Sequence, residues 1–478
     1  MSNNQINRRL KPTYKLSRRQ MMLSSMTTVL GAGLASGAAA LDPRRNPAYV
    51  PGDATPPRPW ADEARDWFPP GQPGKDYTPV FTPNGATLDY KIVDGVKVFH
   101  LIAEEIVHEV APGLVVNCWG YNGRMPGPTI EAVEGDRVRI YVTNRLRVPT
   151  SVHWHAIILP CGMDGVGGLT QPAIQPGETF VSEFIFPDAG SFMYHSHVDP
   201  MTQEGMGLVG SIVVHPRNPK RRPDRDFVLM LHEWAIEPGT SVPNPFEMSD
   251  FNILTINGKS APGTHPLVAE LGDTVRIRIG NLSAMDHHPI HLHGYAFKIT
   301  ETDGGPIPES AQWPETTVLV GVGQTRTIEF LADNPGDWLM HCHMTHHTMN
   351  QMGHDFPNMI GVDPGNIDEK IRKLIPGYMT MGQDGMESMA HMRMPMPENS
   401  IPMLGVQTQF ESTIAGGMLT VLKVRENAPG YEDPGMYDFP EGTLSHRVTA
   451  EELEQDGIEV PKDPSKMQNP DEHDDHEH

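Results

Sequence analysis

The chain has 478 residues, enough for two or three domains, and 38% of them are hydrophobic, which is sufficient for a buried core. The formal net charge of −23 argues against nucleic acid or an anionic membrane as a partner. The 46 glycines and 46 prolines favour many turns and short strands over long helices.

The N-terminal residues look like an export signal. Arg18 and Arg19 precede an apolar stretch that ends in the small residues Ala38–Ala40, which would suit a signal peptidase. Residues 1–40 are therefore predicted to be a twin-arginine signal peptide, and the protein is predicted to be periplasmic or secreted. The stretch is short and interrupted by Ser, Thr and Gly, so no membrane span is expected. Residues 41–86 are rich in proline and polar residues and are predicted to form an extended arm.

The sequence after this arm repeats itself. EGDRVRIYVTN (134–144) matches LGDTVRIRIGN (271–281), and DAGSFMYHSH (188–197) matches NPGDWLMHCH (334–343). The offset is 137 residues for the first match and 146 for the second, so each copy is about 140 residues long.

Both copies have the composition of β-strands. Their segments are rich in branched residues, alternate in part between apolar and polar residues, and follow turns that contain glycine. The fold is therefore predicted to be all-β, with one β-sandwich in residues 87–217 and a second in residues 218–363. Residues 364–478 are predicted to form a C-terminal extension.

Histidines recur in pairs separated by one residue. Side chains at positions i and i+2 of a strand point to the same face, so each pair aims two imidazoles at one place or at two adjacent metals. The pairs are His153/His155, His195/His197, His291/His293 and His341/His343. Imidazole is a good ligand for copper, zinc, iron and nickel. Two pairs at matching positions in each copy indicate a metal site rather than structural histidines.

The second copy carries additional ligand types. They are His288, Cys342, His347 and Met352. One cysteine, two histidines and a weak axial methionine form the ligand set of a blue-copper centre. Because neighbouring residues of a strand point to opposite faces, Cys342 is predicted to bind one copper while His341 and His343 bind another site. The first copy has Ser196 in place of Cys342, so no blue-copper site is expected there.

The segments HWHAI, YHSHVDP, HPIHLHGYAF and HCHMTHHTMNQM resemble the four copper motifs of the multicopper oxidases, and the resemblance covers roughly residues 89–362. It implies two cupredoxin-like Greek-key domains and four copper ions per functional unit. The implied ligands are His288, Cys342, His347 and Met352 for type 1 copper, His153 and His291 for type 2, and His155, His195, His197, His293, His341 and His343 for the type 3 pair. The family takes single electrons from a donor at type 1 copper and reduces O2 to water at the other three.

The resemblance also implies catalytic roles. His341, Cys342 and His343 would connect the type 1 site to the other coppers by a few covalent bonds. Asp164, eleven residues after His153, matches an acidic position near type 2 copper and is predicted to deliver protons or to orient a ligand. The alternative is that this aspartate serves only a turn.

The spacing of the motifs limits the number of domains. Only 90 residues separate His197 from His288, which leaves no room for a third sandwich. The chain thus resembles two-domain laccases with type 1 copper in the second domain. In these relatives each cluster lies between domain one of one chain and domain two of its neighbour in a homotrimer. The sequence itself does not give the number of subunits.

Two further regions have several interpretations. Cys118 and Cys161 would form either a disulfide, which export would permit, or two free thiols. Eight methionines lie between Met379 and Met403, where they would bind Cu(I) or simply pack. A strand is expected within residues 416–427. The acidic, histidine-rich end is predicted to be disordered, with loose metal affinity as the alternative.

The leading functional hypothesis is an exported oxidase that couples oxidation of phenolic, aromatic or metal-ion donors, including Cu(I), to reduction of O2 to water. A copper-sequestering protein is the first alternative, although storage needs no cysteine between two histidines. A copper nitrite reductase is the second alternative, but that enzyme lacks the type 3 pair.

Overall fold

The computed structural model describes residues 68–348, 350, 365–376, 398–402 and 406–459. The predicted signal peptide, Met352, His391, Met379 and Met403 lie outside these residues, and so does the acidic end of the chain. Among the helices that the structure describes, none has the length and apolar character needed to cross a membrane.

The first β-sandwich consists of two sheets. One sheet has the order β1-β2-β5-β7, with β3 paired to β2, and the other has the order β4-β9-β8-β6. The strands are β1 (Tyr90–Val93), β2 (Val96–Ala111), β3 (Leu114–Tyr121), β4 (Gly127–Val133), β5 (Arg137–Asn144), β6 (His153–His155), β7 (Thr179–Ile185), β8 (Gly190–His195) and β9 (Val209–His215). A 3-10 turn, η1 (Cys161–Met163), and a short helix, α2 (Pro200–Gly205), lie in its loops.

The second β-sandwich repeats this plan. Its first sheet has the order β11-β10-β13-β19-β15-β16, with β17 paired to β15, and its second has the order β12-β23-β20-β14-β18. The elements are β10 (Arg225–Trp234), β11 (Ile253–Ile256), β12 (Leu267–Glu270), β13 (Thr274–Asn281), β14 (His288–Leu292), β15 (Phe297–Thr302), β16 (Gly305–Pro306), η2 (Glu309–Ala311), β17 (Pro314–Glu315), β18 (Thr317–Val320), β19 (Thr325–Leu331), β20 (Gly336–Cys342), η3 (Thr345–Thr348) and β23 (Leu419–Arg425).

Smaller pieces of the C-terminal extension lie within the residues that the structure describes. They are α3 (Ile367–Arg372), the two-stranded sheet of β21 (Val406–Gln407) and β22 (Ser412–Thr413), and α5 (Ala450–Gln455). The all-β prediction with two sandwiches is confirmed within the described residues, and so is the strand expected within residues 416–427, which is β23.

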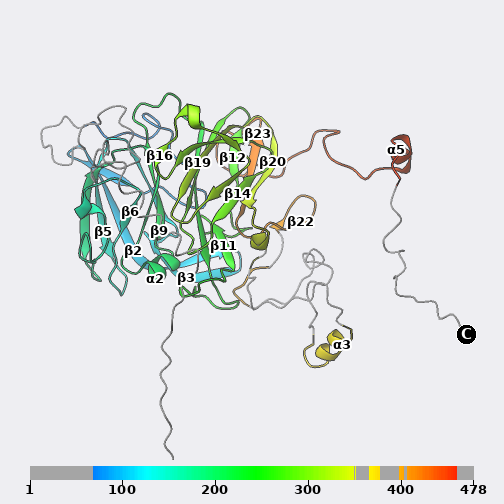
Figure 1. Ribbon diagram of the computed structural model, residues 1–478, viewed down its shortest axis with the longest axis horizontal. Helices are drawn as coiled ribbons and strands as arrows, with labels where there is room; N and C mark the ends of the chain where they lie inside the picture. Colours follow the sequence, from blue (N-terminus) through cyan, green and yellow to red (C-terminus); the bar gives the residue numbers. More distant parts are fainter. Residues whose placement is uncertain (1–67, 349, 351–364, 377–397, 403–405, 460–478) are drawn as a thin grey trace, which may run out of the picture. The chain divides into compact units, whose positions relative to one another are not determined.

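Strand β23 changes the extent of the second sandwich. It pairs in parallel with β12 and antiparallel with β20, and in Figure 1 it is the orange strand beside β20. Backbone hydrogen bonds of β12 and β20 are therefore made to residues beyond position 363, where the second domain was predicted to end.

The repeat is visible in individual hydrogen bonds. The backbone N–H of Leu146 donates to the side chain of Asn144 at 2.8 Å, and that of Ser283 donates to Asn281 at 2.8 Å. These two asparagines end the matching strands β5 and β13. Each copy thus uses the same residue to turn the chain after the same strand.

Apolar side chains form one core in each sandwich and a third cluster between the two. The third cluster joins Met193 and Val209 of the first sandwich to Met230, Trp234 and Ile253 of the second. The two sandwiches therefore share a buried apolar contact within one chain.

A buried ionic network reinforces this contact. Arg278 on β13 donates to both carboxylate oxygens of Asp226, at 2.7 and 3.0 Å, and to Glu301 at 3.0 Å. It also donates to the hydroxyl of Ser191 on β8, at 2.8 Å. The exposed fraction of the Arg278 side chain is 1%, so its charge is balanced by these partners and not by water.

Residues 68–86, the described part of the predicted arm, lie against both sandwiches. The backbone N–H of Val80 donates to Glu131 at 2.9 Å, and Phe81 pairs with Phe227. The ring of Phe81 also stacks on Tyr431, with centroids 4.2 Å apart. This segment is extended but is bound to the body of the protein.

The buried network predicts a large effect of one substitution. Arg278→Met should lower the free energy of unfolding by about 3–5 kcal/mol, because Glu301 would stay buried without its bonded counter-charge. Asp226 would keep Arg276, 3.7 Å away, but would lose both of its short hydrogen bonds to Arg278. Urea unfolding of the metal-free protein, followed by tryptophan fluorescence, measures this change. Arg145→Met is the matched control, since Arg145 is exposed and should shift stability by no more than about 0.5 kcal/mol. A loss below about 1 kcal/mol for Arg278→Met would contradict the assigned role.

Candidate metal centre

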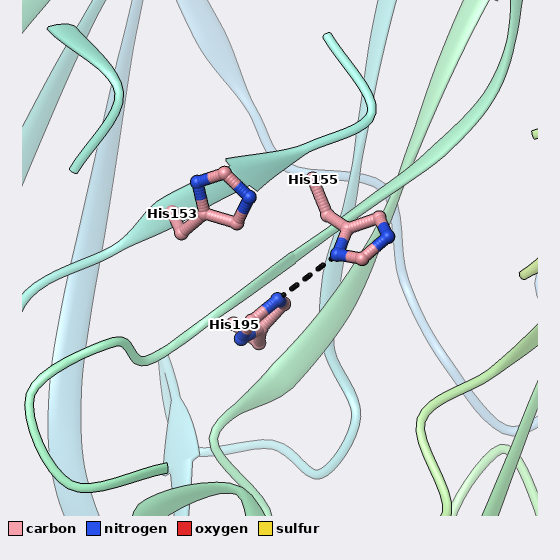
Figure 2. A group of neighbouring side chains, drawn as sticks. All are labelled: His153, His155 and His195. Atoms are coloured by element: carbon pink, nitrogen blue, oxygen red, sulfur yellow. Dashed lines mark hydrogen bonds between the residues drawn. The ribbon is translucent and has the colours of Figure 1, made fainter. Parts of the chain in front are cut away.

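The first group of predicted ligands comes from β6 and β8, which pair so that His153 lies opposite His195. Ligand nitrogens of His153, His155 and His195 all lie within 4.8 Å of one another, and Figure 2 shows the three rings around a common space. Nδ1 of His155 and Nε2 of His195 are 3.2 Å apart. The ring of His197, which follows β8, lies 5.4 Å from that of His153. The four histidines predicted in the first copy are thus brought together.

Hydrogen bonds fix which nitrogen of each ring is available. Nδ1 of His153 donates to the carbonyl oxygen of Asp164 at 2.8 Å, and the Asp164 carboxylate lies 3.4 Å from the same nitrogen. Nδ1 of His195 faces the carbonyl of Ser196 at 2.9 Å and the carboxylate of Glu204 at 3.1 Å. In both rings Nε2 is therefore the nitrogen left for a metal.

Burial and charge act on these rings in opposite directions. Burial lowers the pKa of His153 and of His155 below the usual range, which keeps both rings neutral and able to bind a metal. Burial also acts to lower the pKa of His195, but the hydrogen bond and negative charge of Glu204 outweigh it and raise the pKa.

The second group repeats this arrangement on β14 and β20, where His291 lies opposite His341. Nδ1 of His291 donates to the carbonyl of Thr316 at 2.7 Å, and the Nε2 atoms of His293 and His341 are 3.3 Å apart. The ring of His343 lies 5.5 Å from that of His341. His293 and His343 are exposed, so this group opens onto the surface of the chain.

The two groups of four histidines are separate in the ring contacts of the part of the chain that the structure describes. Among the described residues, ring contacts join histidines inside each group and none joins a histidine of one group to a histidine of the other. Each group alone offers half of the eight imidazoles predicted for the cluster.

A separate group lies on the opposite face of β20. Sγ of Cys342 is 3.7 Å from Nδ1 of His288 and 3.4 Å from Nδ1 of His347. A metal held about 2.0–2.3 Å from each of three ligand atoms in a trigonal plane requires separations of about 3.5–4 Å between those atoms. The three residues therefore fit one copper ion, and Met352, the fourth predicted ligand, lies outside the described residues.

Polar side chains surround this group. Nε2 of His288 bonds the hydroxyl of Ser283 at 2.8 Å and lies 3.7 Å from the carboxylate of Glu233. Burial raises the pKa of Glu233 to about 7, and burial lowers that of His288 to about 3. The two buried side chains thus lie side by side without forming an ion pair in the metal-free chain at acidic pH.

His347 has the opposite electrostatic environment. Its Nε2 lies 3.5 Å from the carboxylate of Asp286, a half-buried residue at the edge of the group. Burial acts to lower the pKa of His347, but the hydrogen bonds to Asp286 and Cys342 outweigh it and raise the pKa to about 9.

Sequence reasoning missed the partners that orient the ligands. Glu204, Glu233, Ser283 and Asp286 belong to no motif in a single sequence. Their positions relative to the ligands became apparent only when loops and strands were packed together.

The thiols of the first copy are both free. Cys118 is buried in β3 and Cys161 is exposed in η1, so the disulfide alternative is wrong for this structure. Burial raises the pKa of Cys118 to about 12, which leaves this thiol protonated and unreactive.

Comparisons with known proteins agree with these histidine and cysteine ligands. Two family models, each described as multicopper oxidase, match residues 104–219 and 237–361, together just over half of the chain. Copper resistance protein A from Escherichia coli is 44% identical over 232 residues, which cover 38% of this chain and 38% of that protein. Multicopper oxidase MmcO from Mycobacterium tuberculosis is 33% identical over 230 residues, which cover 41% of this chain and 44% of that protein.

The chain therefore spans less than half the length of these curated relatives. Among solved structures, the blue copper oxidase from Nitrosomonas europaea is similar, with a TM-score of 0.51 and 28% identity, covering 68% of this chain and 85% of that chain. The fold of that protein, the two family models and the paired histidines with a cysteine between them all point to one family. The chain belongs to the multicopper oxidase family.

Proposed function

We propose that this protein is an exported, laccase-like multicopper oxidase that couples one-electron oxidation of a small donor to the four-electron reduction of O2 to water. The observation that carries the proposal is the end of strand β20, where Cys342 faces one ligand group while His341 and the next residue after the strand, His343, belong to the other. Bound copper would supply the one-electron redox steps and the site at which O2 is reduced. The remaining roles belong to side chains of this chain.

Each side chain has a role that follows from its position. Cys342 gives electrons a covalent path of a few bonds to His341 and His343. Asp164 is placed to hold a proton beside His153, since its carboxylate lies 3.4 Å from that ring. Asp286 lies at the edge of the Cys342 group, where it would orient His347 toward a donor.

The donor is a phenol, an aromatic amine or a metal ion such as Cu(I). The name of the Escherichia coli relative, copper resistance protein A, and the methionines between Met379 and Met403 favour a role in copper handling. Export rests on Arg18 and Arg19 and on the small residues that follow them.

Oxygen uptake separates this proposal from copper sequestration and from nitrite reduction. Uptake with a phenol or with Cu(I) supports an oxidase. Copper binding without uptake supports sequestration, and turnover of nitrite without O2 supports a reductase.

Assembly completes the proposal. We infer a homotrimer in which domain one of one subunit and domain two of the next together bind type 2 and type 3 copper. Support comes from the lack of a ring contact between the two histidine groups among the described residues, and from the exposure of His293 and His343.

The cysteine assignment predicts a colour change. Cys342→Ser should abolish the intense visible band of a thiolate–copper(II) centre and the oxidase activity, while the histidine-bound coppers remain. Visible absorption and copper content per chain measure both effects. Cys118→Ser is the control and should keep the band, because this buried thiol lies in the first sandwich. A blue Cys342→Ser protein would exclude this residue as the type 1 ligand.

The raised pKa of His347 predicts a pH dependence of copper loading. At neutral pH the metal-free ring is protonated, so copper(II) must displace a proton. Affinity at the Cys342 group should rise by at least about tenfold per pH unit up to about pH 9, where this contribution ends. Equilibrium titration of the metal-free protein, followed by the visible band, measures the slope.

Asp286→Asn supplies the control for that slope. Without the carboxylate the pKa of His347 should fall. The rise of copper affinity with pH that is due to His347 should then end at a lower pH. Asp333→Asn, a change of an exposed acid in the same domain, should leave the curve unchanged. Identical curves for all three proteins would show that the proton on His347 does not compete with copper.

The assembly model predicts complementation between inactive variants. One variant carries His153→Ala and His155→Ala, and the other carries His293→Ala and His341→Ala. Co-expressed in mixed rings, an intact domain one of the second variant would meet an intact domain two of the first. Partial recovery of oxygen uptake is expected at those interfaces.

A second pair of variants is the negative control for the same model. Co-expression of the first variant with a His195→Ala, His197→Ala variant damages domain one in both chains and should restore nothing. If mixed rings of the complementary pair form, bind copper and stay inactive, the cluster is not shared between subunits.

A further inference from the structure

The first sandwich contains a buried polar cluster at the place where the second sandwich has its cysteine-containing ligand group. The strand registers define the correspondence, because His153 pairs with His195 as His291 pairs with His341. Ser196 then corresponds to Cys342. Thr150, three residues before His153, corresponds to His288, three residues before His291.

Gln203 on α2 joins these two positions. Its Oε1 accepts a hydrogen bond from the hydroxyl of Thr150 at 2.6 Å and another from the hydroxyl of Ser196. Its Nε2 donates to the carbonyl oxygen of Pro149 at 2.8 Å. One amide side chain therefore connects the segment that leads into β6 with the end of β8.

The cluster is closed to solvent and held in place. Thr150 and Ser196 have no exposed surface, and 2% of Gln203 is exposed. The backbone N–H of Gln203 donates to Asp199 at 2.8 Å, and its carbonyl accepts from Leu208 at 2.9 Å. Buried hydroxyl and amide groups are costly to leave unpaired, so the three side chains remain in one arrangement.

We propose that Gln203, together with Thr150 and Ser196, positions the first-sandwich histidines for copper by hydrogen bonds in place of a metal–thiolate centre. In the second sandwich, a copper ion bound by Cys342 and His288 would tie β20 to β14. In the first sandwich, the Gln203 amide makes the equivalent tie. Ser196 lies between His195 and His197, so a shift of its backbone moves both rings. This proposal rests on the proposed copper function.

A purely structural cluster would act on stability alone, whereas a positioning cluster also acts on metal binding. Partners that orient metal ligands typically change affinity by about 10–100-fold when they are removed. The Cys342 group in the second sandwich provides an internal reference, because its visible band reports a site that the Gln203 cluster does not touch.

Two substitutions test the proposal with the full-length copper-loaded protein. Thr150→Val replaces one hydroxyl by a methyl of similar size, and Gln203→Met removes all three hydrogen bonds at similar volume. Each protein is dialysed against graded concentrations of a chelator. Copper content and the paramagnetic resonance signal of type 2 copper are then measured beside the visible band.

Both variants should lose histidine-bound copper at about 10–100-fold lower chelator concentration than the unmodified protein, with the visible band unchanged. Thr150→Ser keeps the hydroxyl and should behave like the unmodified protein. Thr129→Val is the matched control, since it removes a buried hydroxyl of the same domain that bonds Thr82 at 2.9 Å.

Unchanged copper retention and an unchanged type 2 signal in Thr150→Val would overturn the proposal, whatever happens to the melting temperature. Equal loss of the visible band and of histidine-bound copper would also overturn it, because the effect would then be general. If Gln203→Met does not fold, Thr150→Val decides alone. An unmodified protein without a visible band when copper-loaded would contradict the proposed function itself.

Discussion

The antiparallel pairing of two histidine-bearing strands is the constraint on which the rest of the structure depends. His153 lies opposite His195 in the first sandwich, and His291 lies opposite His341 in the second. Because strand side chains alternate between faces, this register brings imidazoles from both strands to one face. A shift of one residue would move every ligand to the other face.

The same alternation makes β20 bifunctional. Cys342 contacts His288 and His347 on one side, while its neighbours join the histidine group on the other. A single strand therefore contributes ligands to two groups, one on each of its faces. The first sandwich keeps the strand and the register but places Ser196 at the equivalent position, where Gln203 binds it.

The two copies share a fold plan but not an environment. Tyr141 on β5 and Arg278 on β13 occupy equivalent positions, yet Tyr141 is 36% exposed and Arg278 is buried. Strand β8 of the first sandwich covers the sheet of the second, and Ser191 on that strand bonds Arg278. Arg278 on β13 is consequently buried among ionic partners, whereas the equivalent Tyr141 on β5 is open to solvent.

The sequence by itself determined the internal repeat, the β class of both copies and the spacing of the paired histidines around Cys342. These features are local, since a period of two and a residue between two ligands are readable within a few positions. Tertiary structure alone decided that β23 enters the second sandwich between β12 and β20. It also decided that Asp286 and Glu204 stand beside the ring nitrogens of His347 and His195. These contacts join residues from different loops and strands, so their partners are set by how the strands pack and not by any local pattern.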